Sequence, residues 1–293
     1  MRQIKTISVI ICLITTILTI TGKIYASTVS VNIHPSLLVL NASSGQKYQE
    51  SVYFTNQTGE TLEISAYASG FTEYKNTNHP IFIPNDSERN WIDIQNYPKT
   101  VESNESIKIK YSINIPQNAP AGSHMLSIIV KENSGKINVS LATLIIINIS
   151  GKINVKGAID KFYTPSLIML QNKVPFIIDF HNYGNIVLSP SGFINIYNLW
   201  GKKITSISIN NTNSLTLPGY TRKYTSSWNN SNILNQIGYY KAEIYLSYGV
   251  QGQAYNVSGK ISFIEINWKE ALITIFILII LVVYITQRRK WKN

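Results

Sequence analysis

Apolar and polar residues alternate in short runs along most of the chain, from Ser27 to Asn267. In residues 107–115 the odd positions are apolar and the even ones polar, whereas in residues 240–248 the even positions carry the apolar face. A period of two is typical of strands with one buried and one solvated face, as in antiparallel sheets. Gly, Pro, Asn and Ser separate the runs, and no helical period persists. The pattern therefore predicts an all-β fold built from sandwiches.

Two blocks of sequence recur in the two halves of this region. Residues 52–56 (VYFTN) resemble residues 178–182 (IDFHN), and residues 122–130 resemble residues 238–246. The blocks come in the same order in both halves, which favours two copies of one topology. We place the boundary at Ser150-Gly151-Lys152, so that residues 27–151 form the first sandwich and residues 152–267 the second.

The second block has a feature of immunoglobulin-type domains, which carry a Tyr two residues before a core Cys in the sixth strand. Tyr240 and Ala242 hold these places in one copy, and His124 and Leu126 hold them in the other. The halves thus look like immunoglobulin-like domains in which aliphatic packing replaces the disulfide. We expect His124 and Tyr240 to be structural and to hydrogen-bond the backbone at a corner.

The N-terminus has the order of a secretory signal peptide. Arg2 and Lys5 precede an apolar stretch over residues 7–20, and a small residue, Ala26, ends the segment. We predict a signal peptide over residues 1–26, with an uncleaved anchor as the alternative. The single cysteine, Cys12, lies inside this segment, so the remaining chain has neither a disulfide nor a thiolate site.

A second apolar stretch lies near the C-terminus, where no charge occurs between Glu270 and Arg288. It has about 17 residues, or roughly 26 Å as a helix, which is just enough for a hydrocarbon core. An interfacial aromatic and a cluster of cations flank it, which predicts a transmembrane helix over 268–287 and a basic cytoplasmic tail over 288–293. The alternative is a buried core helix. The candidate anchor residues are Trp268, Arg288, Arg289 and Lys290.

The net charge of +11 concentrates at the two ends, and roughly +5 remains between Ser27 and Lys269. The lysines of that region are spread singly along the strands, which excludes the basic patch of a nucleic-acid binder.

Motifs of catalysis are missing from the sequence. The four histidines have no metal-ligand spacing, and we find no HExxH, GxSxG or phosphate-binding glycine loop. We therefore predict a protein without enzymatic activity, cofactor, metal or small-molecule substrate. Glu102 and Glu105 are typical of a solvated turn, although carboxylates that converge in space would escape a sequence motif.

Residues 70–91 form the longest irregular connection that we expect in the first copy. Aromatic residues among adaptable polar neighbours suit recognition of a glycan or protein surface. Packing of these aromatics into the core beneath a loop is the alternative. The candidate partner-binding residues are Phe71, Tyr74, Phe82 and Trp91.

Residues 141–149 (LATLIIINI) are the most apolar run of the region. Such a run predicts a strand that is buried on both faces. The alternative is a sheet edge that accepts a strand from a partner or donates one.

Potential glycosylation sites of the type N-x-S/T are frequent. Asn-rich and Ser-rich composition also produces such triplets by chance, and Asn56 and Asn148 fall where side chains should be buried. The nine triplets start at Asn41, Asn56, Asn85, Asn104, Asn138, Asn148, Asn210, Asn229 and Asn256.

These features together resemble a group of prokaryotic cell-surface proteins that includes the WxL-interacting proteins of Gram-positive bacteria. The resemblance implies a signal peptide, two immunoglobulin-like domains and one C-terminal membrane helix. It also implies peptidoglycan binding by the first domain and binding of protein partners or host ligands by the second, although no individual binding residue transfers. The residues that carry the resemblance are Pro35, 37–40, 52–56, Trp91-Ile92, Pro116, Gly122, 180–185, 217–219, Arg222, Trp228 and 238–240.

The leading hypothesis is a non-catalytic, single-pass type I membrane protein. Its N-terminal domains would be extracytoplasmic and would bind or scaffold a cell-envelope polymer or surface protein. The alternative is an assembly chaperone that resembles the pilus chaperones and acts by strand complementation. An envelope enzyme is the third possibility.

Overall fold

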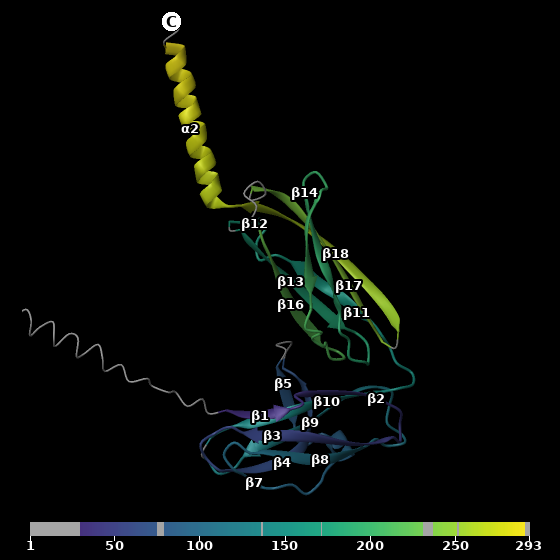
Figure 1. Ribbon diagram of the computed structural model, residues 1–293. Helices are drawn as coiled ribbons and strands as arrows, with labels where there is room; N and C mark the ends of the chain where they lie inside the picture. Colours follow the sequence, from purple (N-terminus) through teal and green to yellow (C-terminus); the bar gives the residue numbers. More distant parts are fainter. Residues whose placement is uncertain are drawn as a thin grey trace, which may run out of the picture.

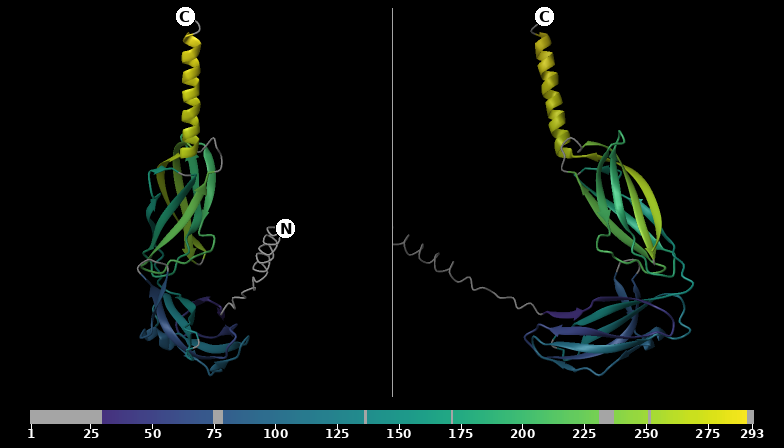
Figure 2. Two further views of the ribbon diagram at one scale, coloured as in Figure 1. Left: turned by 90° about the vertical axis from the view of Figure 1, so that its left-hand side faces the viewer. Right: turned by 45° about the vertical axis from the view of Figure 1, so that its right-hand side comes forward.

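The computed structural model describes residues 30–74, 79–135, 137–170, 172–230, 237–250 and 252–290, which form two β-sandwiches and a C-terminal helix (Figures 1 and 2). The second sandwich stands on one face of the first, and the helix leaves it at the opposite end. The predicted signal peptide, residues 1–26, lies outside the described residues.

The first sandwich packs a four-stranded sheet against a six-stranded one. Alternate residues of both sheets point inward, and Val52, Phe54, Ile109 and Leu126 are among the side chains that this core buries. The first sheet has the order β1 (Val31–His34), β3 (Lys47–Asn56), β8 (Ser106–Asn114) and β6 (Ile92–Ile94). The second has the order β2 (Leu37–Ala42), β10 (Ser140–Ile149), β9 (Gly122–Glu132), β4 (Leu62–Glu73) and β5 (Pro80–Ile83), and β7 (Thr100–Val101) pairs with β4. A 3-10 helix, η1 (Ser87–Trp91), precedes β6.

The second sandwich packs a three-stranded sheet against a five-stranded one. Its core is more aromatic than the first, since Phe176, Trp228, Tyr240 and Phe263 contact one another through their rings. The smaller sheet has the order β11 (Gly157–Tyr163), β13 (Lys173–Asn182) and β16 (Thr221–Asn229). The larger has the order β12 (Ile168–Met169), β18 (Gln253–Ile266), β17 (Ile237–Val250), β14 (Ser191–Asn198) and β15 (Lys203–Ile209).

The repeated sequence blocks occupy matching places in the two sandwiches. Asn56 ends β3, Asn182 ends β13, and both side chains are fully buried. Each uses its amide nitrogen to bond backbone carbonyls of two further segments, at 2.8 to 3.1 Å. The similarity between residues 52–56 and 178–182 therefore has a physical cause, because each Asn ties the end of a core strand to the loops around it.

The helix α2 (Trp268–Lys290) corrects the membrane prediction. Among the described residues, none of the helices combines the length and apolar character needed to cross a membrane. The uncharged part of α2 has only about 17 residues, at the lower limit for a span, and it includes the polar residues Thr274, Thr286 and Gln287. The predicted transmembrane helix over 268–287 is therefore wrong.

Three further predictions depended on that helix and are wrong for the same reason. They are the single-pass type I placement, the membrane as a partner, and the anchor role of Trp268, Arg288, Arg289 and Lys290. Trp268 is half exposed at the first position of α2.

A buried carboxyl lies in the core of the second sandwich near the start of α2. The side chain of Glu265 is fully buried; Asn230 donates to its Oε2 at 2.8 Å, and its Oε1 has no hydrogen-bond partner. Burial raises the pKa of Glu265 to about 6, and the hydrogen bond from Asn230 offsets only part of this effect.

We expect Glu265→Gln to stabilise the protein at neutral pH by about 1–2 kcal/mol. Because the folded pKa lies above that of the unfolded chain, ionisation costs stability as the pH rises from about 4.5 through about 6. Urea denaturation at a series of pH values would show a decline for the natural chain over this window and a flatter curve for the variant. Curves of the same shape for the two proteins would contradict the raised pKa of Glu265.

Candidate functional site

The outer face of the six-stranded sheet carries apolar side chains on its first two strands. Leu144 pairs with Leu37 and Ile146 with Val39, across the parallel strands β10 and β2. The intervening residue Ile145 points into the core of the first sandwich. The run 141–149 is therefore apolar on both faces, as predicted, and its outer face lies toward the second sandwich (Figure 1).

An apolar cluster joins the two sandwiches at this face. Phe71 and Ile146 of the first sandwich pack with Leu217 of the second, and all three are buried. The hydroxyl groups of Thr72 and Tyr220 form a hydrogen bond beside them. The sandwiches are therefore in direct contact through side chains and do not rely on the linker alone.

A groove of about 240 Å³ opens beside this cluster. Its floor on the first sandwich includes the apolar residues Leu37, Phe71 and Leu144. Thr72, Glu73 and His79 also line it. Its far wall is the segment 212–217 of the second sandwich together with Arg222, which donates to the carbonyl of Leu215 at 2.7 Å. We call this the interdomain groove.

The groove adjoins an open sheet edge. β10 lies between β2 and β9, so β2 is the terminal strand of the sheet. The amides of Leu144 and Ser150 donate to the carbonyls of Ser36 and Ala42, at 2.9 and 2.8 Å. Since backbone groups alternate in direction along a strand, those of the odd-numbered residues in β2 point away from β10.

At this edge Leu37 and Val39 expose 42% and 46% of their surface. The carbonyl of the next outward residue, Asn41, accepts from the Tyr48 hydroxyl at 3.3 Å, which closes that end of the edge. The accessible part of β2 therefore runs from Leu37 to Val39. The alternative that residues 141–149 themselves form the edge is wrong, because β2 covers β10.

The predicted partner-binding residues do not form one loop. β4 continues to Glu73, and β5 pairs back onto it, with Phe71 opposite Phe82. Both aromatics pack in the apolar cluster beside the groove. Tyr74 is exposed at the end of β4, whereas Trp91 is buried in the core of the first sandwich, with its ring 4.8 Å from that of His124.

Sequence reasoning missed most of the groove. The aliphatic outer face of β2 and β10, and Arg222 on β16, were not proposed as site residues. The lack of alternation within residues 141–149 was the available signal. It shows that both faces are covered, but the residues that cover them come from a distant part of the chain.

In the described ranges, no three His, Asp or Glu side chains come together in a way that could hold a metal ion. Glu105 accepts a hydrogen bond from the backbone amide of Glu102 at 2.7 Å. This pair therefore closes a turn before β8, as expected for a solvated turn.

Comparison with known proteins finds neither a matching family model nor a matching curated protein. Solved structures with a similar fold include the class 5 fimbriae chaperone CfaA, at 13% identity and a TM-score of 0.40, covering 81% of this chain and 99% of that one. The CsuC–CsuE chaperone–tip adhesion subunit complex of Acinetobacter baumannii matches at 12% identity and a TM-score of 0.39, covering 78% and 98%. The E. coli chaperone DraB matches at 13% identity and a TM-score of 0.34, covering 80% and 97%. At these identities and TM-scores the likeness assigns no activity to this chain.

The expected membrane anchor and the expected binding of peptidoglycan both need correction. The solved structures named above are fimbrial chaperones. The leading hypothesis also loses the membrane tether that would display the domains to an envelope polymer or surface protein. Peptidoglycan binding by a membrane-displayed scaffold is therefore not supported.

Proposed function

We propose that this protein binds an extended segment of a partner polypeptide as an added strand on β2, in the manner of an assembly chaperone. The observation that carries the proposal is the open edge at Leu37 and Val39, which lies directly beside the mainly apolar interdomain groove. An open edge offers unpaired backbone donors and acceptors to any chain of extended conformation. The role is one of binding and holding, without catalysis.

The geometry also indicates which segments would bind. A strand added to β2 places every second side chain on the outer face, beside Leu37 and Val39. Apolar side chains at those positions extend the contact toward Leu144 and the groove. We therefore expect partners whose segments alternate apolar and polar residues, since such strands cover one apolar face and leave the other solvated.

Backbone hydrogen bonds supply a sequence-independent part of the affinity. Each contributes about 0.5–1.5 kcal/mol after exchange with water. Leu37 and Val39 each offer one N–H and one C=O, so up to four bonds are available along the accessible part of β2. Together with burial of two aliphatic side chains, they suffice for weak but measurable peptide binding.

We expect Val39→Pro to weaken the binding of a short synthetic peptide that alternates valine and threonine by about tenfold. Proline removes the outward amide and places its ring at the edge, while the ladder to β10 uses the neighbouring residues. Val39→Thr keeps the amide and the branched shape, and is the matched control. Fluorescence anisotropy of the labelled peptide measures both affinities.

A second experiment changes the peptide and leaves the protein unchanged. The same peptide with all of its backbone nitrogens methylated has no N–H donor on either edge and is expected not to bind. Equal affinity of the methylated peptide, or of the proline and threonine variants, would overturn the proposal.

A further inference from the structure

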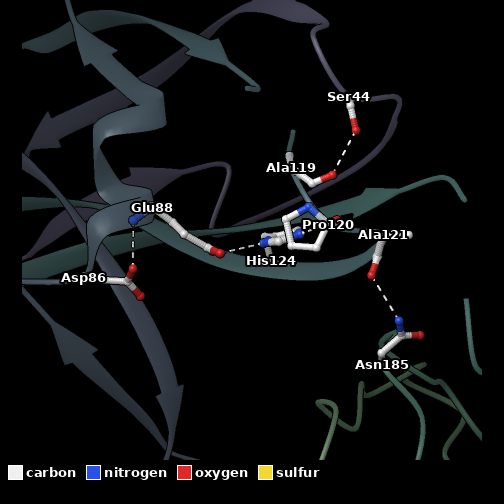
Figure 3. A network of polar contacts seen from close by, with 8 residues as sticks. All are labelled: Ser44, Asp86, Glu88, Ala119, Pro120, Ala121, His124 and Asn185. Atoms are coloured by element: carbon white, nitrogen blue, oxygen red, sulfur yellow. Dashed lines mark hydrogen bonds and ion pairs between the residues drawn. The ribbon is translucent and has the colours of Figure 1, made fainter. Parts of the chain in front are cut away.

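His124 lies on β9 at the end that faces the second sandwich, and only 8% of its side chain is exposed. Its Nδ1 lies 2.8 Å from Oε1 of Glu88, and its Nε2 lies 2.9 Å from the carbonyl oxygen of Pro120 (Figure 3). The ring of Trp91 packs on the imidazole with centroids 4.8 Å apart. Both ring nitrogens of a nearly buried histidine are therefore engaged.

Both partners of the ring are hydrogen-bond acceptors. A carboxylate and a backbone carbonyl only accept, whereas a neutral imidazole carries a single N–H. The two contacts can be made together only by the imidazolium, which donates from both nitrogens. Loss of its proton leaves one of the two oxygens without its donor.

The loop that His124 holds is also the attachment point of the second sandwich. Asn185 donates from its side chain to the carbonyl of Ala121 at 3.0 Å (Figure 3). Its own backbone carbonyl accepts from the amide of Ser123 at 2.8 Å. The hydroxyl of Ser123 accepts from the amide of Val187 at 2.8 Å. We call residues 119–123 and 185–187 the joint.

Close approach at the joint requires a glycine. Gly122 has a φ of +130°, and a Cβ at this position would lie 2.5 Å from the carbonyl oxygen of Asn185. On the other side of the loop, Ser44 donates to the carbonyl of Ala119 at 3.0 Å. Hydrogen bonds from both sandwiches thus hold the loop in place. The bond from His124 to Pro120 is one of those that connect it to the first sandwich.

We propose that His124 is a proton-controlled latch: its imidazolium holds the joint between the two sandwiches, and loss of the proton releases Pro120 and loosens the joint. The bond to Glu88 is the one retained, because a carboxylate is a stronger acceptor than a carbonyl. This inference concerns the geometry of the joint and does not depend on what the interdomain groove binds.

The groups around the imidazole ring decide whether the pKa of His124 is raised or lowered. Burial disfavours the charged form, but the hydrogen bond to Glu88, the Pro120 carbonyl, and the charges of Glu88 and Asp86 outweigh it, so the pKa of His124 lies above its usual value of 6.5. Arg89, the cation of the same segment, donates instead to the carbonyl of Pro84. From β10 the residue opposite is the uncharged Ile147.

The sign of the pH dependence follows from this direction. Because the folded state raises the pKa, the stabilisation is complete below about 6.5 and is lost as the pH rises through the folded value. The joint is therefore held at mildly acidic pH and loosened at alkaline pH.

The test is the distribution of distances between spin labels on the two sandwiches of the full chain. The only cysteine is removed as Cys12→Ser, and labels are attached at the exposed positions Lys110→Cys and Lys202→Cys. We expect a narrow distribution at about pH 5.5 and a broader one at about pH 8.5. The midpoint should coincide with the titration of the His124 ring followed by ¹⁵N NMR.

Three variants separate the latch from a merely structural role. His124→Asn is expected to give the broad distribution at both pH values. Glu88→Gln, a near-isosteric change at a side chain that is 32% exposed, is expected to move the midpoint down by about one pH unit. His181→Asn, on the second sandwich, should leave the transition unchanged. Equal distributions at the two pH values, or a midpoint that Glu88→Gln does not move, would overturn the proposal.

Discussion

Asn56→Ala is expected to lower the free energy of unfolding of the first sandwich by about 3–5 kcal/mol. The amide nitrogen of Asn56 bonds the carbonyls of Glu60, Val101 and Glu102 at 2.8 to 3.1 Å. Its oxygen accepts from the amide and the hydroxyl of Thr58, at 2.9 and 2.6 Å. Alanine removes all of these bonds at a buried site. The Glu60 carbonyl keeps the Thr58 hydroxyl as a donor and the Glu102 carbonyl keeps the amide of Glu105. The expected loss therefore comes mainly from the Val101 carbonyl and the Thr58 amide, since each buried unsatisfied group costs about 1–3 kcal/mol.

Urea denaturation followed by circular dichroism measures this effect. Asn138→Ala, at an exposed position in another N-x-S/T triplet, is the matched control and should change stability by less than about 0.5 kcal/mol. A loss below about 1 kcal/mol for Asn56→Ala would mean that the loops hold the strand end without this residue. Complete burial also excludes Asn56 as a glycosylation site in the folded protein.

Leu217→Asp is expected to separate the two sandwiches. Leu217 is buried against Phe71 and Ile146, and loss of a buried leucine costs about 1.5–3 kcal/mol. A carboxylate in that apolar cluster adds the cost of burying a charge. Opening the contact avoids this cost, so the variant should keep both folds and lose their fixed arrangement, together with the interdomain groove.

Small-angle X-ray scattering and thermal unfolding report the separation. The variant should have a larger radius of gyration than the natural chain and should unfold in two transitions. Leu199→Asp makes the same change on the second sandwich at a side chain that is 66% exposed, and should alter neither measurement. Scattering curves that coincide for Leu217→Asp and the natural chain would show that the linker and the joint alone fix the arrangement.

Much of the fold could be predicted from local sequence. Alternation in residues 107–115 and 240–248 corresponds to strands β8 and β17. Comparison of the two halves aligned the segments that became β3 and β13, and it matched His124 with Tyr240. The expectation that His124 bonds the backbone is confirmed by its contact with Pro120. These features depend on neighbouring residues, which is why sequence patterns reveal them.

The candidate site depends on strand order, which local patterns do not encode. The run 141–149 predicted a doubly covered strand, but not that β2 would lie outside it. Residues 70–91 were interpreted as a loop because of their many polar residues, although Phe71 and Phe82 pair across two strands. Trp91 belongs to the core because the short helix η1 turns it inward.

Hydropathy alone overstated the role of the C-terminal segment. An uncharged stretch flanked by an aromatic residue and cations predicts a transmembrane helix. Its length of about 17 residues is the minimum for a span, and at that length the composition alone does not distinguish a transmembrane helix from another apolar helix. In the part of the chain that the structure describes, α2 does not have the length and apolar character of a membrane-crossing helix.

Amide hydrogen exchange at single-residue resolution, with and without the valine–threonine peptide, tests the proposed edge most directly. If the peptide adds a strand to β2, the outward amides of Leu37 and Val39 become protected, while those of Leu38 and Leu40, already directed at β10, change little. Protection confined to another surface, or none at Leu37 and Val39 when the peptide is bound, would contradict the account.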